Sequence, residues 1–160
     1  MVTNLFTSVS DKYDLMNDAM SFGLHRLWKK KMVNICNLEN VSKVIDIASG
    51  TGDITLQLLK KNKKLSVTCL DNSQEMHQIC KNKMIDNGFI KNIAYICSSV
   101  EKCTLKDNSF DLATIAFGFR NFTDHNESLK SIYRILKPGG KIVLLELCNP
   151  KNKYINNSNG

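Results

Sequence analysis

The chain has 160 residues, of which 42% are hydrophobic, and a formal net charge of +7. This length fits one globular domain and leaves little room for a second. No apolar run approaches the roughly 18 residues of a membrane-spanning helix, and the first residues lack the pattern of a signal or transit peptide. We therefore expect an intracellular, cytoplasmic protein.

The charged residues and the cysteines exclude two kinds of site. Lysines gather at 29–31 and 60–64 without interleaved aromatic residues. This pattern predicts solvated helix faces and no nucleic-acid binding, and it leaves weak attraction to an anionic membrane surface open. The cysteines include no C-x-x-C pair, and Cys69, Cys97 and Cys148 lie in apolar runs. Buried, reduced thiols and no metal site are expected.

Helical and strand-like segments alternate along most of the chain. A stripe of Leu24, Trp28, Met32 and Ile35 predicts a helix over 24–36 that packs on a core. The expected strands are 43–48, 65–71, 92–97, 110–117 and 141–148, and the expected helices are 51–61, 73–87 and 125–136. This alternation predicts an α/β fold with a doubly wound parallel sheet.

The chain divides into three expected parts. Residues 1–36 are predicted to form an N-terminal helical cover segment, and residues 37–148 the α/β domain. Residues 149–160 are polar and rich in asparagine, so we expect a disordered tail. The residues 137–140, Lys-Pro-Gly-Gly, are expected to break the chain between the last helix and the last strand.

The first predicted strand opens into a glycine turn, VIDIASGTGDIT at residues 44–55. A P-loop needs a lysine after its glycines, and none is present here. A dinucleotide-binding turn needs a third glycine, where this chain has Thr55. In addition, the carboxylate of Asp53 in the first helical turn is expected to repel a pyrophosphate. Both phosphate ligands are therefore disfavoured.

A cationic ligand without phosphate suits the same turn better. In S-adenosyl-L-methionine (SAM), a sulfonium and an ammonium group carry positive charge that Asp46 can offset. Gly50 and Gly52 let the backbone approach a ligand closely. Asp71, at the end of the second predicted strand, is placed to accept hydrogen bonds from two ribose hydroxyls. The turn and this acid together predict a SAM site.

Three segments carry a resemblance to a known family. They are YDLMNDAMSFGLHRLW (13–28), DNSFDLATIAFGFRNFTD (107–124) and RILKPGGKIVLLELC (134–148). They are similar to the first signature, the central block and the second signature of the ubiquinone/menaquinone biosynthesis C-methyltransferase (UbiE-type) family. The resemblance covers residues 5–150. It implies a Rossmann-like class I methyltransferase fold that uses SAM to methylate a ring carbon of a polyprenyl benzoquinol or a demethylmenaquinol.

The resemblance also assigns cofactor contacts. The family's positions correspond to Thr51, Asp71, Ser99, Val100 and Ala116 in this chain. Ser99 and Val100 follow the third predicted strand, where the adenine of SAM is expected to lie. A helix cap is the alternative for Ser99.

The chain departs from the family pattern in several places. Ser49 stands where the family usually has glycine, Cys148 where it has serine, and Ala116 where a serine side chain can bond the cofactor. Family members also continue well beyond this sequence, so we expect the last strands of their sheet to be missing. This departure puts activity in doubt more than cofactor binding.

Candidate catalytic residues follow the fourth predicted strand, at the sheet edge where α/β proteins bind ligands. Methyl transfer to a quinol carbon needs an in-line approach and an electron-rich ring. Arg120 is the candidate to stabilise a phenolate and Asn121 to orient it, and His25 is the candidate base. An ion pair with a structural carboxylate is the alternative for Arg120, and a packed core position is the alternative for His25.

Four further residues are candidates for substrate contact. Tyr13 and Asn17 lie in the first signature and, like His25, can cover the site or act as a base. Phe117 and Phe119 can line a channel for the prenyl chain, although core packing is equally compatible with them. The partners expected from the resemblance are a prenylated quinol, the surface of an inner membrane (with the mitochondrial matrix as location in a eukaryote), and a homo-oligomer or a quinone-biosynthesis complex.

Three other functions remain open from the sequence. The chain can be a methyltransferase for another small molecule, or a SAM-binding remnant without catalysis. A dehydrogenase is a more distant alternative. Binding of SAM, followed by an assay of methyl transfer to a soluble quinol, separates these possibilities.

Overall fold

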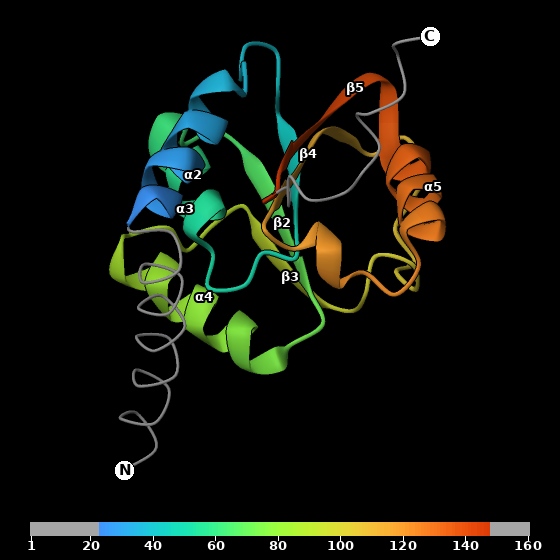
Figure 1. The fold of residues 1–160 in the computed structure, drawn as a ribbon. Helices are drawn as coiled ribbons and strands as arrows, with labels where there is room; N and C mark the ends of the chain where they lie inside the picture. Colours follow the sequence, from blue (N-terminus) through green and yellow to red (C-terminus); the bar gives the residue numbers. More distant parts are fainter. Residues whose placement is uncertain (1–22, 148–160) are drawn as a thin grey trace, which may run out of the picture.

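The computed structural model describes residues 23–147. They form a central sheet with helices on both faces (Figure 1). The strands are β1 (Lys43–Ile47), β2 (Ser66–Asp71), β3 (Ile93–Cys97), β4 (Phe110–Ala116) and β5 (Leu136–Leu145). The helices are α2 (Leu24–Ile35), α3 (Asp53–Lys61), α4 (Gln74–Asp86), α5 (His125–Ile135) and the 3-10 helix η1 (Phe119–Asn121). Each helix and strand predicted within the described residues is therefore present.

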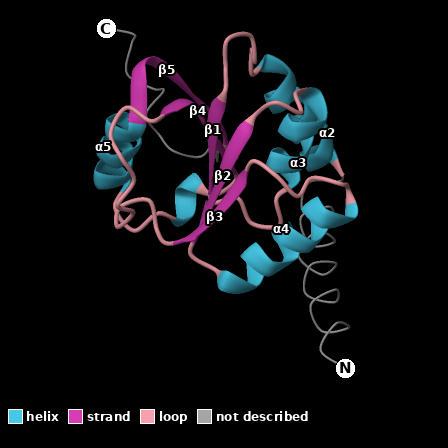
Figure 2. Ribbon diagram, turned by 180° about the vertical axis from the view of Figure 1, so that it is seen from behind, coloured by secondary structure: helices cyan, strands magenta, loops and turns pink. Residues whose placement is uncertain are grey.

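The sheet has five parallel strands in the order β3-β2-β1-β4-β5. Helices α2, α3 and α4 cover one face, and α5 covers the other (Figures 1 and 2). The strand order reverses between β1 and β4, which makes the carboxyl ends of these two strands the switch point of a doubly wound sheet. This architecture confirms the predicted fold class.

Side chains of β1 alternate between two hydrophobic clusters. Val44 packs into the cluster beneath α2, α3 and α4, whereas Ile45 and Ile47 pack into the cluster beneath α5. Successive strand residues point to opposite faces, so a strand covered on both sides needs an unbroken apolar run. The sequence of β1 meets this need, except that Asp46 is polar and buried.

The predicted apolar stripe of α2 is only partly correct. Leu24 and Ile35 are exposed, at 42% and 65%, whereas His25, Met32 and Val33 are buried. The helix packs against α3 and β5, and the face it presents to them is rotated relative to the stripe that the sequence suggests. Trp28 lies at the edge of the buried face. The rotation makes His25 a core residue.

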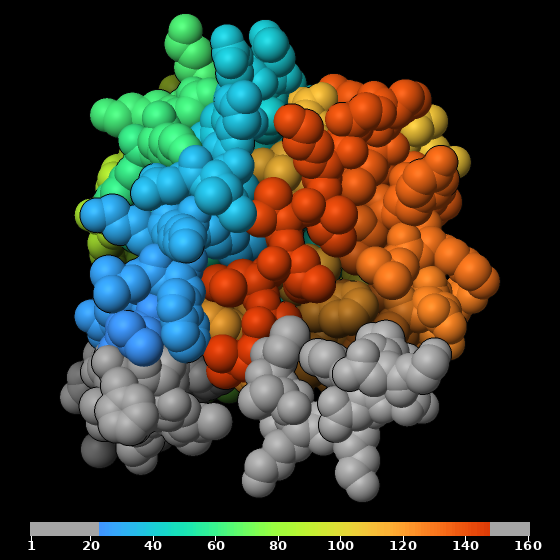
Figure 3. All heavy atoms as spheres, turned by 45° about the horizontal axis from the view of Figure 1, so that its top comes forward, coloured from blue at the N-terminus to red at the C-terminus, as the bar shows by residue number. Residues whose placement is uncertain are grey.

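Strand β5 begins earlier than predicted. It starts at Leu136, and the sequence 137–140 forms an irregularity inside the strand, because Phe110 pairs with Leu136 while Leu112 pairs with Lys141. Gly139 permits this bulge with a φ of +78°. The predicted chain break is therefore wrong. Part of β5 reaches the surface between α2 and α5 (Figure 3), with Leu144 46% exposed.

The predicted core thiols divide into three cases. Cys69 is fully buried, as expected, while Cys97 is exposed at the end of the edge strand β3. Cys97 therefore does not belong to the core, because β3 has a neighbour on one side only. Cys148 and the predicted tail lie outside the described residues. Within residues 23–147, no helix combines the length and apolar character needed to cross a membrane.

Candidate functional site

A cavity of about 270 Å³ opens at the carboxyl ends of the strands. Loops after β1, β2, β3 and β4 contribute to its wall, which is the arrangement expected for a ligand site at a switch point. Seven of the residues predicted from the sequence line it: Gly50, Asp71, Ser99, Val100, Ala116, Phe117 and Asn121.

Asp71 connects two loops of this cavity. One carboxylate oxygen accepts a hydrogen bond from the Gly50 N–H at 2.8 Å, and the other accepts one from the Ser73 N–H at 2.9 Å. Ser73 in turn caps α4, because its hydroxyl accepts from the Met76 N–H. Each carboxylate oxygen has two lone pairs, so Asp71 retains capacity for the hydroxyls of a ligand.

The loop after β3 supplies a small polar residue and an apolar one. Ser99 begins a turn, closed by a hydrogen bond from the Lys102 N–H to the Ser99 carbonyl oxygen at 3.2 Å. No helix follows this turn before β4, so Ser99 is not a helix cap. Val100 packs into the cluster beneath α5 and lines the cavity. An apolar wall beside exposed backbone suits a planar heterocycle.

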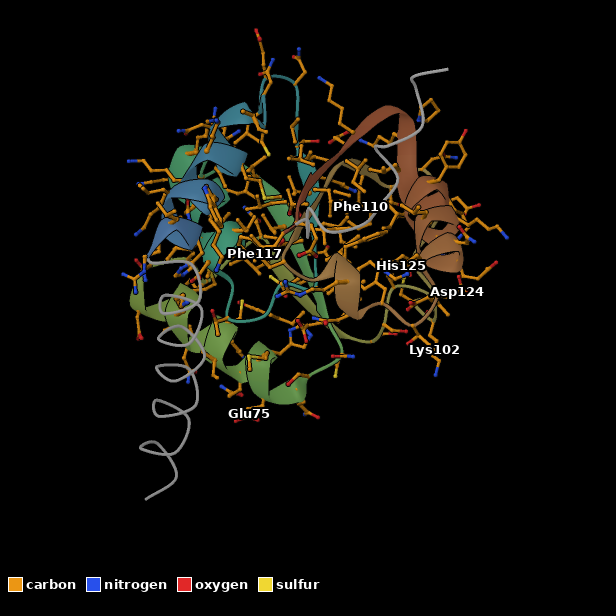
Figure 4. All side chains as sticks on the ribbon, in the orientation of Figure 1. Glu75, Lys102, Phe110, Phe117, Asp124 and His125 are labelled. Carbon is orange, nitrogen blue, oxygen red and sulfur yellow. The ribbon has the colours of Figure 1, made fainter. Side chains whose placement is uncertain are left out.

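The ends of β1 and β4 have an unusual backbone. Ala48 and Phe117 both have positive φ angles, +54° and +58°, which is uncommon for residues other than glycine. Gly118 lies against Ala48: a Cβ atom on Gly118 would be 2.4 Å from the Ala48 Cβ. Such backbone conformations concentrate at functional sites. The Phe117 ring lies 6.3 Å from the Trp28 ring, beside α2 (Figure 4).

A second, smaller cavity of about 40 Å³ adjoins the first and shares Ala48, Gly50 and Ala116 with it. Asp46 lines it and is fully buried, and its carboxylate accepts hydrogen bonds from the hydroxyls of Thr55 at 2.7 Å and Thr114 at 2.8 Å. Burial raises the pKa of Asp46 to about 6, although both hydrogen bonds act to lower it. Asp46 is therefore charged at pH 7.

Asp53 lies between two lysines at the start of α3. Lys29 Nζ donates to one carboxylate oxygen at 2.7 Å, and Lys83 Nζ donates to the other at 2.6 Å. Burial acts to raise the pKa of Asp53, but the two ammonium groups outweigh it and hold this pKa well below its usual range. The predicted repulsion of a pyrophosphate by Asp53 is wrong, because the cluster of these three groups carries a net positive charge.

Thr55 disfavours a dinucleotide in the structure, as it does in the sequence. The Thr55 side chain is buried and donates its hydrogen bond to Asp46. It therefore occupies the space between helix and strand that a third glycine leaves open in a dinucleotide-binding turn.

Two predicted cofactor residues have other surroundings. Thr51 lines the second cavity only, and its hydroxyl accepts a hydrogen bond from Lys83 Nζ at 3.2 Å. Gly52 lines neither cavity. It precedes α3 with a φ of +81°, and a Cβ atom there would lie 2.4 Å from the Cys80 Sγ. Gly52 therefore allows α3 to pack closely against α4.

Three predicted catalytic or substrate residues lie outside the cavity walls. Arg120 is about half exposed; its Nη1 atom lies 3.5 Å from a Glu146 oxygen, and its backbone N–H donates to the same carboxylate. His25 is buried within α2. Phe119 packs against Phe122 and against His125, and His125 lies at the start of α5 (Figure 4). The ion-pair alternative thus describes Arg120, and the core alternatives describe His25 and Phe119. Tyr13 and Asn17 lie outside the described residues.

Several wall residues were not identified from the sequence. Gly118 and Ala48 form the close contact between β1 and β4, and Lys29 reaches the second cavity from α2. The glycine in the sequence FGFRN (117–121) was a signal for the close contact at Gly118. Lys29 was counted with a solvated lysine cluster, and nothing local distinguishes it.

Within residues 23–147, no three His, Cys, Asp or Glu side chains are grouped so as to hold a metal ion.

The two cavities fit SAM. A Cβ atom on Gly50, which lines both cavities, would meet no protein atom within 4 Å, so the backbone there borders open space. A ribose can bind Asp71, and an adenine can bind beside Ser99 and Val100. The amino-acid end then lies towards the second cavity and Asp46. Together, these residues can hold a nucleoside with a charged amino-acid group.

Comparison with known proteins gives one family. The family model described as the ubiE/COQ5 methyltransferase family matches residues 1–159. The ubiquinone/menaquinone biosynthesis C-methyltransferase UbiE of Wigglesworthia glossinidia brevipalpis is 47% identical, over 97% of this chain and 62% of the relative. The UbiE protein of Rickettsia typhi is 48% identical, over 94% and 62%. The chain thus spans about 62% of the length of these curated relatives.

Solved structures share the fold. A protein of Methanococcus maripaludis, assigned as a SAM-dependent methyltransferase, aligns with a TM-score of 0.70 and 28% identity, over 84% of this chain and 62% of that protein. A SAM-dependent methyltransferase of Aquifex aeolicus aligns with a TM-score of 0.63 and 27% identity, over 72% and 61%. These likenesses agree with a Rossmann-like methyltransferase fold.

Proposed function

This chain belongs to the ubiE/COQ5 methyltransferase family, and from that premise we propose that it is a SAM-dependent C-methyltransferase that acts on a ring carbon of a prenylated benzoquinol or a demethylmenaquinol. One observation carries the proposal. The cavity at the switch point is lined by Gly50, Asp71, Ser99 and Val100, which are the residues that the glycine turn and the family resemblance assign to the cofactor.

SAM supplies a methyl group on a sulfonium, which is already a good electrophile. The task of the protein is to hold an acceptor carbon in line with that group and to keep the acceptor electron-rich. Asp71 fixes the ribose and, through Gly50, the loop after β1. Phe117 and Asn121 lie in the wall after β4, where an aromatic acceptor would pack and where an amide would orient a hydroxyl. Arg120 precedes Asn121 and lines neither cavity, so its guanidinium would reach the acceptor only by leaving Glu146.

The test measures binding and transfer separately. Calorimetric titration with SAM is expected to show binding, and a short-prenyl benzoquinol is expected to gain one methyl group from isotopically labelled SAM. Binding without transfer to any quinol would leave a SAM-binding remnant. Methyl transfer only to unrelated small molecules would contradict the proposal that a quinol is the substrate. Binding of NAD without SAM would favour a dehydrogenase.

Arg120→Ala is expected to reduce turnover of the quinol by about 100-fold, because a hydrogen bond from a charged donor to a developing phenolate contributes several kcal/mol. The affinity for SAM is expected to stay unchanged, since Arg120 lines neither cavity. The matched control is Lys130→Ala, an exposed cation on α5 that pairs with Glu127. Unchanged turnover in the Arg120 variant, with SAM still bound, would leave Arg120 as a structural partner of Glu146 only.

Cofactor affinity is expected to depend on pH through Asp46. The pKa of Asp46 is raised to about 6, so the carboxylate that offsets the ligand's ammonium group is lost as the pH falls through that value. S-adenosylhomocysteine is expected to bind up to about tenfold more weakly at pH 5 than at pH 7.5. The control ligand 5′-methylthioadenosine has no ammonium group, so its affinity is expected to stay constant. An equal response of both ligands would exclude Asp46 as the cause.

We also propose a cytoplasmic location with peripheral membrane association, or the matrix side of the inner membrane in a mitochondrion. The net charge of +7 and the lysine clusters support attraction to anionic lipids, and a prenylated quinol resides in a membrane. Co-sedimentation with vesicles that contain anionic lipid, but not with neutral vesicles, is the expected result. A homo-oligomer or a complex with other quinone-pathway proteins remains a prediction, which light scattering of the purified chain addresses in part.

A further inference from the structure

The second cavity carries charges of both signs on its wall. Asp46 lies at its base in the sheet, and Lys29 reaches it from α2. Lys29 is held there by Asp53, and its side chain is only 12% exposed. Since Lys83 also binds Asp53, the cluster of two lysines and one carboxylate carries one net positive charge, and the Asp46 carboxylate in the same wall is the nearby charge of opposite sign. A ligand group that meets Lys29 would therefore be an anion.

An unused hydrogen-bonding group lies in the same wall. The Ser49 Oγ atom is buried and has no hydrogen-bond partner among the described residues, and Ser49 lines the second cavity. A buried hydroxyl without a partner is costly. Rotation about the Cα–Cβ bond can turn this hydroxyl towards a ligand oxygen.

We propose that the Lys29 ammonium group binds the α-carboxylate of the cofactor, and that the Ser49 hydroxyl donates a second hydrogen bond to it. Asp53 also lines the second cavity, but its two carboxylate oxygens accept hydrogen bonds from Lys29 and Lys83, so we assign it as a positioning residue that orients Lys29. This inference rests on the proposed function, since it places the amino-acid end of SAM in the second cavity. The two charges of that end then meet opposite charges: the ammonium faces Asp46, and the carboxylate faces Lys29.

The proposal separates two groups of ligands. A ligand with the amino-acid end, such as S-adenosylhomocysteine, uses Lys29 and Ser49. A ligand that stops at the thioether, such as 5′-methylthioadenosine, occupies only the larger cavity with Asp71, Ser99 and Val100. A defect at Lys29 therefore weakens the first ligand and spares the second.

The experiment titrates the full chain with both ligands by calorimetry. Lys29→Met is expected to weaken binding of S-adenosylhomocysteine by about 10- to 100-fold, the usual size for a charge-assisted hydrogen bond, and to leave 5′-methylthioadenosine unchanged. Ser49→Ala is expected to weaken the first ligand by about 3- to 10-fold. Lys31→Met removes an exposed lysine from the same helix and is the matched control, with both affinities unchanged.

The outcomes distinguish this inference from the function on which it rests. If Lys29→Met weakens both ligands equally or neither, Lys29 does not bind the carboxylate, and the inference is wrong. If Ser49→Ala leaves the affinity for both ligands unchanged, the Ser49 hydroxyl does not bind the carboxylate. If the unaltered chain binds neither ligand, the proposed SAM site itself fails. Binding of 5′-methylthioadenosine by each variant also shows that the variant is folded.

Discussion

Asp71→Ala is expected to lower the affinity for S-adenosylhomocysteine by about 100-fold. A carboxylate that accepts hydrogen bonds from two ribose hydroxyls contributes about 1.5 to 3 kcal/mol through such charge-assisted contacts, and tenfold in affinity corresponds to about 1.4 kcal/mol. The substitution also removes the acceptor for the N–H groups of Gly50 and Ser73. The loop after β1 and the start of α4 therefore lose their connection at the cavity.

This effect differs from that of Lys29→Met because it does not depend on the amino-acid end of the ligand. Both S-adenosylhomocysteine and 5′-methylthioadenosine carry the ribose, so both are expected to lose affinity together in a calorimetric titration. Asp86→Ala removes an exposed carboxylate from the end of α4 and is the matched control, with unchanged binding. Retention of full affinity by a folded Asp71→Ala variant would mean that the ribose is held elsewhere.

Asp53→Asn is expected to lower the free energy of unfolding at pH 7 by about 2 to 4 kcal/mol. The Lys29 and Lys83 ammonium groups face each other across this carboxylate, and both side chains are less than one quarter exposed. Removing the charge between two partly buried cations leaves them without compensation, which is the costly case for an ion pair. Urea unfolding followed by circular dichroism measures the difference.

The sign of the pH dependence provides a second check. The pKa of Asp53 is lower in the folded chain than in the unfolded chain. The stability that the Asp53 charge contributes is therefore fully present above the unfolded pKa near pH 4, and it is lost progressively as the pH falls from there to the folded pKa. The difference between the original chain and Asp53→Asn is therefore expected to shrink below pH 4. Glu127→Gln alters an exposed ion pair on α5 and is expected to have no measurable effect. A difference that stayed constant with pH would contradict an electrostatic origin.

Most of the residues predicted to bind the cofactor line one cavity, and there is a physical reason for this convergence. The carboxyl ends of parallel strands all meet at one edge of a sheet, so residues that follow strands in the sequence converge without further information. Asp71, Ser99 and Ala116 each follow or end a predicted strand, and the structure brings all three to one cavity. The glycines at 50 and 52 marked the turn, because both have a left-handed backbone, which favours glycine.

The surroundings of the predicted catalytic residues could not be predicted from the sequence in the same way. Arg120 was selected by its place after β4, but the carboxylate beside it belongs to Glu146, 26 residues away at the end of β5. His25 was selected from the first signature, and the rotation of α2 on α3 and β5 placed it in the core. Neither outcome follows from local periodicity, since each depends on which faces two separate elements turn towards each other.

Local sequence thus determined the order of helices and strands, the parallel sheet and the edge at which a ligand binds, because hydrophobic period and glycine positions act over a few residues. Only the tertiary structure decided the charges at that edge. Lys29 and Asp53 are 24 residues apart and Lys83 and Asp53 are 30 apart, and they meet because α2, α3 and α4 pack on one face of the sheet. That packing neutralises a turn that is acidic in the sequence, since the energy of a charge depends on its neighbours in space.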